Sequence, residues 1–98
     1  MNTIDYALIF KSMGDPTRLQ IIKMLSEGEK CACKLLEAFD ITQPTLSYHM
    51  KSLSECDLVS VRKEGKWSHY SMNKNVLLDF QDFISSLTSN SGADSQCL

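Results

Sequence analysis

Residues 31–54 read CACKLLEAFDITQPTLSYHMKSLS, and this stretch decides the fold. Apolar residues recur at helical spacing in both halves, so we predict one helix over 31–39 and a second over 42–54. Thr42 is a suitable N-cap for the second helix, and Pro44 fits its first turn, where a missing N–H costs nothing. The expected inward positions are Leu35, Leu36, Phe39, Leu46, Met50 and Leu53. Two helices joined by so short a turn form a helix-turn-helix.

Two further helices are expected on the N-terminal side of this stretch. The first covers residues 2–13 and is ended by Gly14. Asp15 is a good N-cap for the second, Pro16 fits its first position, and the helix runs to about residue 26.

The pattern changes after Asp57. Residues 58–61 and 67–72 favour strands, and 63–66 (KEGK) form a hairpin loop with glycine where a positive φ is wanted. Residues 76–87 are apolar at helical spacing and predict a final helix.

These elements predict a mainly helical winged helix-turn-helix with a small β-hairpin, in the order α-α-α-α-β-β-α. Residues 1–88 form one domain, and 89–98, rich in Ser, Asn, Gly and Asp, form a flexible tail. The terminal helices carry more apolar surface than so small a core needs, so we expect them to pair two subunits into a homodimer.

Composition narrows the function. The 98 residues contain no apolar run of the roughly 18–20 residues that span a membrane, and the first residues do not resemble a signal peptide. We therefore expect a cytoplasmic protein without a membrane partner, whose four cysteines are thiols. No nucleophile with a positioned base is evident, which argues against an enzyme. The net charge is −2, but residues 43–74 carry a local +2.

That locally basic segment is expected to bind double-stranded DNA. Polar side chains of the second helix can contact base edges or phosphates, and basic side chains of the hairpin suit backbone or minor-groove contact. The expected DNA-binding residues are Gln43, Thr45, Ser47, Tyr48, His49, Lys51, Arg62, Lys63 and Lys66.

Cys31 and Cys33 open the first helix of the helix-turn-helix. On a regular helix two residues two apart differ by about 200°, so a single ion would have to loosen the first turn, and we expect this conflict to be a switch. The helix N-terminus and the flanking Lys30 and Lys34 are expected to favour thiolates. Thiolates select soft ions such as As(III), Sb(III), Cd(II), Pb(II), Zn(II) or Cu(I).

Three motifs resemble the ArsR/SmtB family of metal-responsive repressors: GDPTRL at 14–19, TQPTLSYHMKSL at 42–53 and GKWSHY at 65–70. The resemblance spans about residues 5–87. It implies a homodimeric winged helix repressor that binds operator DNA without inducer. Arsenic and cadmium/lead sensors of that family carry Cys-x-Cys at this helix, so the resemblance implies As(III) or Sb(III), held by Cys31 and Cys33, as inducer.

The sequence departs from those sensors in two places. Lys34 stands where the family often has Asp, and Leu36 stands where the arsenic-sensing type has a third cysteine. A trigonal As(III) site needs a third sulfur, for which we favour Cys97, with Cys56 or an external thiol as alternatives. Other open readings are a Cd(II)-, Pb(II)- or Zn(II)-responsive repressor, a thiol-redox-sensing regulator, and a DNA-binding module with inert thiols.

Overall fold

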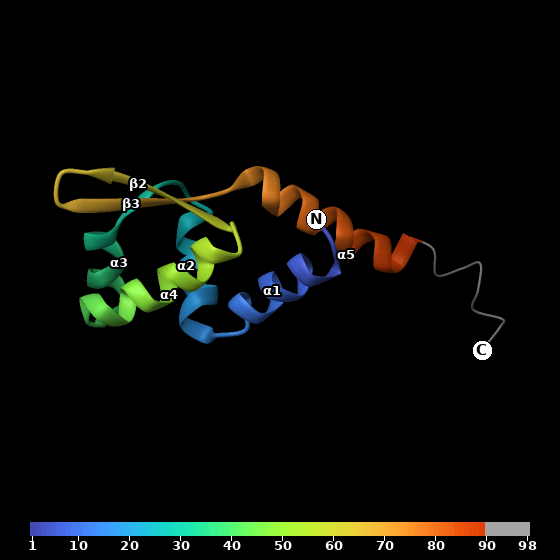
Figure 1. The fold of residues 1–98 in the computed structure, drawn as a ribbon. Coiled ribbons are helices and arrows are strands. Elements are labelled where there is room, and N and C mark those ends of the chain that lie inside the picture. Colours follow the sequence, from blue (N-terminus) through green and yellow to red (C-terminus); the bar gives the residue numbers. More distant parts are fainter. Residues whose placement is uncertain (90–98) are drawn as a thin grey trace.

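The computed structural model describes residues 1–89, which form five helices and a three-stranded antiparallel sheet (Figure 1). The elements are α1 (Thr3–Met13), α2 (Pro16–Leu25), β1 (Lys30–Cys31), α3 (Ala32–Phe39), α4 (Gln43–Glu55), β2 (Val59–Glu64), β3 (Trp67–Met72) and α5 (Lys74–Ser89). Helices α3 and α4 form the expected helix-turn-helix, and the β2–β3 hairpin extends beside them as a wing. The expected winged helix-turn-helix is confirmed.

The core lies where α1, α2, α3 and α4 meet the base of the sheet. Its fully buried side chains are Ile9, Ile21, Leu35, Leu46, Met50, Leu53 and Leu58. The expected inward face of α4 is thereby confirmed, and Leu36 and Phe39 of α3 pack at the edge of the same cluster. Among residues 1–89, no helix is long and apolar enough to cross a membrane.

Local capping explains where the helices begin. The Asp15 carboxylate accepts a hydrogen bond from the Arg18 N–H at 3.0 Å, and Pro16 occupies the first turn of α2. The Thr42 hydroxyl accepts from the Thr45 N–H at 3.3 Å and caps α4. Both expected caps are therefore present.

The wing has a tighter turn than expected. Residues 63–66 were predicted as a loop, but Lys63 and Glu64 continue β2, and Glu64 pairs with Trp67. Only Gly65 and Lys66 form the connection. Gly65 has φ +61°, and a two-residue turn with glycine first suits the twist of a hairpin.

A short strand, β1, was not expected. Lys30 pairs with Tyr70 and Cys31 with His69, so β3 lies between β1 and β2. A two-residue strand carries no alternation that a sequence pattern can reveal. The predicted order therefore lacked one element, and Cys31 ends a strand rather than opening a helix.

Helices α1 and α5 pack against each other through aromatic rings. Tyr6 stacks on Phe83 at 4.1 Å between ring centroids, and Phe10 meets Phe80 edge-on at 4.9 Å. The Tyr6 hydroxyl donates to Asp79 at 2.6 Å, which raises the pKa of Tyr6. Several large apolar side chains of these helices remain exposed: Ile4, Leu8, Phe10, Leu78, Ile84 and Leu87.

Candidate functional site

The outer face of α4 presents most of the residues expected to contact DNA. Gln43, Thr45, Ser47, Tyr48 and Lys51 are all exposed, and Tyr48 retains 67 % of its surface. The apolar residues of α4 are buried and these polar residues are exposed, so the helix has one side anchored in the core and a polar surface available to a groove.

His49 does not belong to that exposed face, so its expected DNA contact stays a prediction that its burial does not support. Its side chain is buried, with Nδ1 at 3.3 Å from Nη1 of Arg18 and 3.9 Å from the Asp15 carboxylate. His49 stands three residues after Leu46 and four before Leu53, spacings that place it on the buried side of a helix. That spacing was a signal in the sequence.

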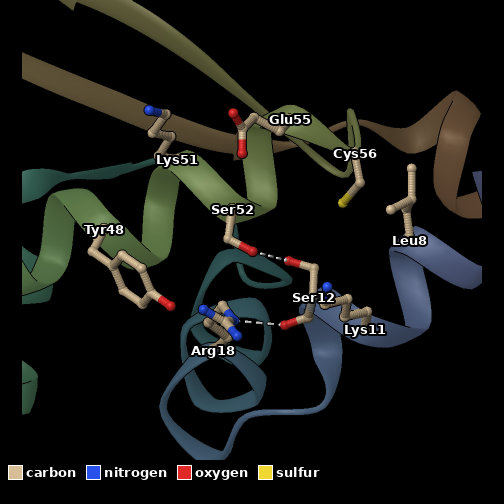
Figure 2. A pocket seen from close by; sticks show the side chains of 9 residues that line it. All are labelled: Leu8, Lys11, Ser12, Arg18, Tyr48, Lys51, Ser52, Glu55 and Cys56. Atoms are coloured by element: carbon tan, nitrogen blue, oxygen red, sulfur yellow. Dashed lines mark hydrogen bonds between the residues drawn. The ribbon is translucent and has the colours of Figure 1, made fainter.

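Arg18 is a residue that the sequence analysis missed. It borders a cavity of about 430 Å³ among α1, α2 and α4, shown in Figure 2. Its Nε donates to the Ser12 carbonyl at 2.7 Å, and its guanidinium lies 5.8 Å from the centre of the Tyr48 ring, within cation–π range. Ser12 and Ser52 also join their hydroxyls at 2.9 Å. These polar contacts fix α4 against α1 and α2.

The wing carries the three expected basic residues, but they differ in availability. The Arg62 guanidinium donates to Glu29 at 2.8 Å and also to Glu64, and these carboxylates raise the pKa of Arg62. Arg62 in turn lowers the pKa of both glutamates. Lys63 and Lys66 are exposed beside the turn. Arg62 therefore joins the wing to the segment before β1, and a phosphate would have to displace a carboxylate to bind it.

The two cysteines of the Cys-x-Cys motif lie together at the start of α3. Cys31 has extended backbone angles (φ −70°, ψ 147°) and is the N-cap of α3, and its Sγ accepts a 3.4 Å hydrogen bond from the Cys33 N–H. The Cys33 thiol donates to Cys31 Sγ, with the sulfurs 2.8 Å apart. The expectation that the helix holds the thiols apart is wrong, because Cys31 is not in the helix.

For Cys33, the expectation of a ready thiolate also needs correction. The hydrogen bond to Cys31 is the main cause that raises the pKa of the Cys33 thiol, and desolvation adds to it. Backbone hydrogen bonds of Lys34 and of Cys33 itself act in the opposite direction but are weaker. The Lys30 ammonium lies 3.6 Å from the Glu27 carboxylate, which offsets its positive charge. Cys33 therefore holds its proton at neutral pH.

The described residues supply two sulfur ligands at this site. Cys56 is the C-cap of α4 and lines the cavity of Figure 2, whereas Cys31 lines a separate groove by α3. Cys97 lies outside the described residues. Within 1–89, no group of three or more His, Cys, Asp or Glu side chains could hold an ion. The Cys31 and Cys33 sulfurs are the kind of donor that suits a soft ion.

Comparison with known proteins places this chain among bacterial regulators. Residues 15–61 match the family described as "Bacterial regulatory protein, arsR family". Over 84 residues the chain is 46 % identical to the arsenical resistance operon repressor of Staphylococcus xylosus. The aligned segment covers 86 % of this chain and 77 % of that protein. The chain belongs to the ArsR family.

A second relative agrees with this assignment, and a solved structure shares the fold of the chain. The arsenical resistance operon repressor of Staphylococcus aureus is 41 % identical over 98 residues, covering all of this chain and 91 % of that protein. A crystal structure of an ArsR family transcriptional regulator superposes with a TM-score of 0.85 at 19 % identity, covering 95 % of this chain and 96 % of that one, which supports the fold. Members of the ArsR family are transcriptional regulators and not enzymes.

Proposed function

We propose that this protein is a cytoplasmic, metalloid-responsive transcriptional repressor, which binds operator DNA as a homodimer and leaves it when As(III) or Sb(III) binds Cys31 and Cys33. The observation that carries the proposal is the pair of sulfurs 2.8 Å apart where β1 passes into α3. Relatives named arsenical resistance operon repressors support the identity of the inducer.

In the DNA-bound state, α4 would lie in the major groove with Gln43, Thr45 and Ser47 toward base edges, while Lys63 and Lys66 of the wing reach the backbone or minor groove. The exposed apolar side chains of α1 and α5 would be covered by a second copy of the chain. Two reading heads held in this way suit two half-sites one helical turn apart.

Release follows from the position of Cys31. Its backbone pairs with His69 of the wing strand β3, and its side chain caps α3, which packs on α4. Two sulfurs 2.8 Å apart and each about 2.3 Å from one ion would subtend an angle of only about 75° at that ion. This angle is narrower than in a trigonal or a tetrahedral site, so the two sulfurs must separate on binding. Cys31 Sγ then also loses the Cys33 N–H. An ion held there favours a different placement of α3 and the wing and so lowers affinity for DNA.

The third sulfur that we favoured from the sequence is Cys97, and the path along the chain limits how it could act. Figure 1 shows α5 continuing in the direction of β3, away from α3. From His69 to the end of α5 the chain covers roughly 16 Å of extended backbone and 24 Å of helix. The eight residues that follow Ser89, up to Cys97, span at most about 29 Å. Cys97 could therefore reach this site only in a second copy of the chain and not in its own.

The proposal is tested by DNA mobility with the full chain and As(III), Sb(III), Cd(II), Pb(II) or Zn(II). We expect micromolar arsenite to release operator DNA from the wild type and from Cys56→Ser, the matched control, but not from Cys31→Ala or Cys33→Ala. If arsenite released operator DNA from all of these variants, the proposal would be overturned. A stronger response to Cd(II), Pb(II) or Zn(II) than to As(III) would replace the inducer but keep the switch.

Thiol-redox sensing is a second candidate because the close sulfurs also favour oxidation. In this reading an oxidant joins Cys31 and Cys33, and peroxide releases DNA whereas arsenite does not. A reductant would then restore binding. Retention of DNA under both treatments would leave a DNA-binding module with inert thiols.

A further inference from the structure

A groove of about 530 Å³ opens beside the cysteine pair, between the end of α2 and the outer side of α3. Its volume is in the range of pockets that hold small molecules. Cys31 forms part of its wall, so an ion held by the two sulfurs would lie at the edge of the groove. The groove is separate from the cavity of Figure 2, with which it shares no lining residue.

The lining of this groove combines three kinds of chemistry. Lys34 supplies an ammonium group that attracts carboxylates, and Lys30 adds a second one, which it shares with Glu27. Glu37 supplies a carboxylate that attracts an amine, whereas the other lining carboxylate, Glu29, is bound by Arg62. Met24 and Ala38 provide an apolar surface between them. Together with an ion at Cys31, these groups match a small molecule that carries a thiol, carboxylates and an amine.

We infer that this groove binds a low-molecular-weight thiol of the amino-acid or peptide class, whose sulfur becomes the third ligand of As(III). The inference rests on the proposed function and deepens it. It explains how a chain whose described residues supply only two sulfur ligands could form a trigonal site without Cys97.

The reaction balances without a redox step. Arsenous acid, As(OH)₃, meets the thiols of Cys31, Cys33 and the small molecule. Three As–S bonds form as three As–O bonds break, and each hydroxide leaves as water with one thiol proton. Arsenic stays in the +3 state throughout. Lys30 and Lys34 act by holding the carboxylates of the small thiol while its sulfur reaches the arsenic.

Native mass spectrometry of the full chain tests the inference with arsenite plus either glutathione or 2-mercaptoethanol. We expect one arsenic and one glutathione per chain, and retention of glutathione at lower concentration than 2-mercaptoethanol, which has no charged groups. The double variant Lys30→Ala/Lys34→Ala would lose two partly exposed ion pairs to the carboxylates of glutathione. It should therefore retain glutathione about tenfold more weakly, with no change in the retention of 2-mercaptoethanol. Lys23→Ala, on the exposed side of α2, is the matched control.

The outcomes separate the two proposals. An adduct of arsenic alone that disappears in Cys97→Ser would overturn the groove and keep the repressor proposal, because the chain would then supply its own third sulfur. Equal retention of both thiols in the wild type and the double variant would also overturn the groove. Arsenic binding that survives in Cys31→Ala/Cys33→Ala would instead refute the proposed sensor.

Discussion

The affinity of Cys31 and Cys33 for Cd(II) should depend steeply on pH. The hydrogen bond that the Cys33 thiol donates to Cys31 raises the pKa of Cys33, so this thiol is protonated at neutral pH. Cadmium binds the thiolate, and this proton must leave when the ion binds. Each proton released changes the binding constant about tenfold per pH unit. Between pH 6 and 8 the Cys33 proton alone should therefore raise the Cd(II) association constant about 100-fold.

Arsenite provides an internal comparison for this prediction. Arsenous acid is neutral, and its condensation with thiols releases water instead of protons, so its affinity should stay nearly constant over the same range. Both constants can be measured by competitive titration, with cadmium followed by its thiolate absorption band in the ultraviolet. Cys56→Ser should keep the cadmium slope. A wild-type cadmium constant that does not change between pH 6 and 8 would show that Cys33 is already a thiolate or is not a ligand, and would refute the reasoning.

Three further predictions concern the fold. Leu53→Ala removes a fully buried side chain and should lower the free energy of unfolding, measured in urea, by about 2–5 kcal/mol. A loss below about 1 kcal/mol would contradict the place of Leu53 in the core. Gly65→Ala meets no atom within 4 Å, so only its φ of +61° matters; we expect a loss of about 1 kcal/mol in the same assay, and no loss would argue against the two-residue turn. The N–H of Arg18 lowers the pKa of Asp15, so the stability from this cap is present at neutral pH and is lost as pH falls below about 4 through the folded-state pKa. Thermal melts of Asp15→Asn should therefore show a smaller loss of stability with acid than the wild type, and identical acid profiles would contradict the assignment.

The sequence was sufficient for features that depend on local chemistry. Asp15 and Thr42 are caps by residue type, and Leu46, Met50 and Leu53 recur at the spacing of one helix face, so the helix-turn-helix could be located. The two strands of the wing were predicted for the same reason, although β2 runs three residues beyond its expected end.

Features that depend on contacts between distant residues could not be predicted. Strand β1 exists because Lys30 and Cys31 pair with Tyr70 and His69, about 40 residues away in the chain. The placement of Cys31 outside the helix follows from that pairing, and so does the close approach of the two sulfurs. Arg18 likewise gains its role only when α1, α2 and α4 are packed together.

The cap of α3 has a consequence for how the protein can be engineered. Sulfur is a weak acceptor, and Cys31 holds the first turn of α3 with a 3.4 Å hydrogen bond, where serine or aspartate would be stronger. Under the proposed function, Cys31 loses this hydrogen bond when it binds an ion, and a weak bond opposes ion binding less than a strong one would. Replacing Cys31 by serine would do more than remove a ligand, because serine would fasten the helix by about 0.5–2 kcal/mol relative to alanine. Under the proposed function, Cys31→Ser should therefore bind operator DNA with or without the ion. The start of α3 should also be more stable in this variant than in the wild type.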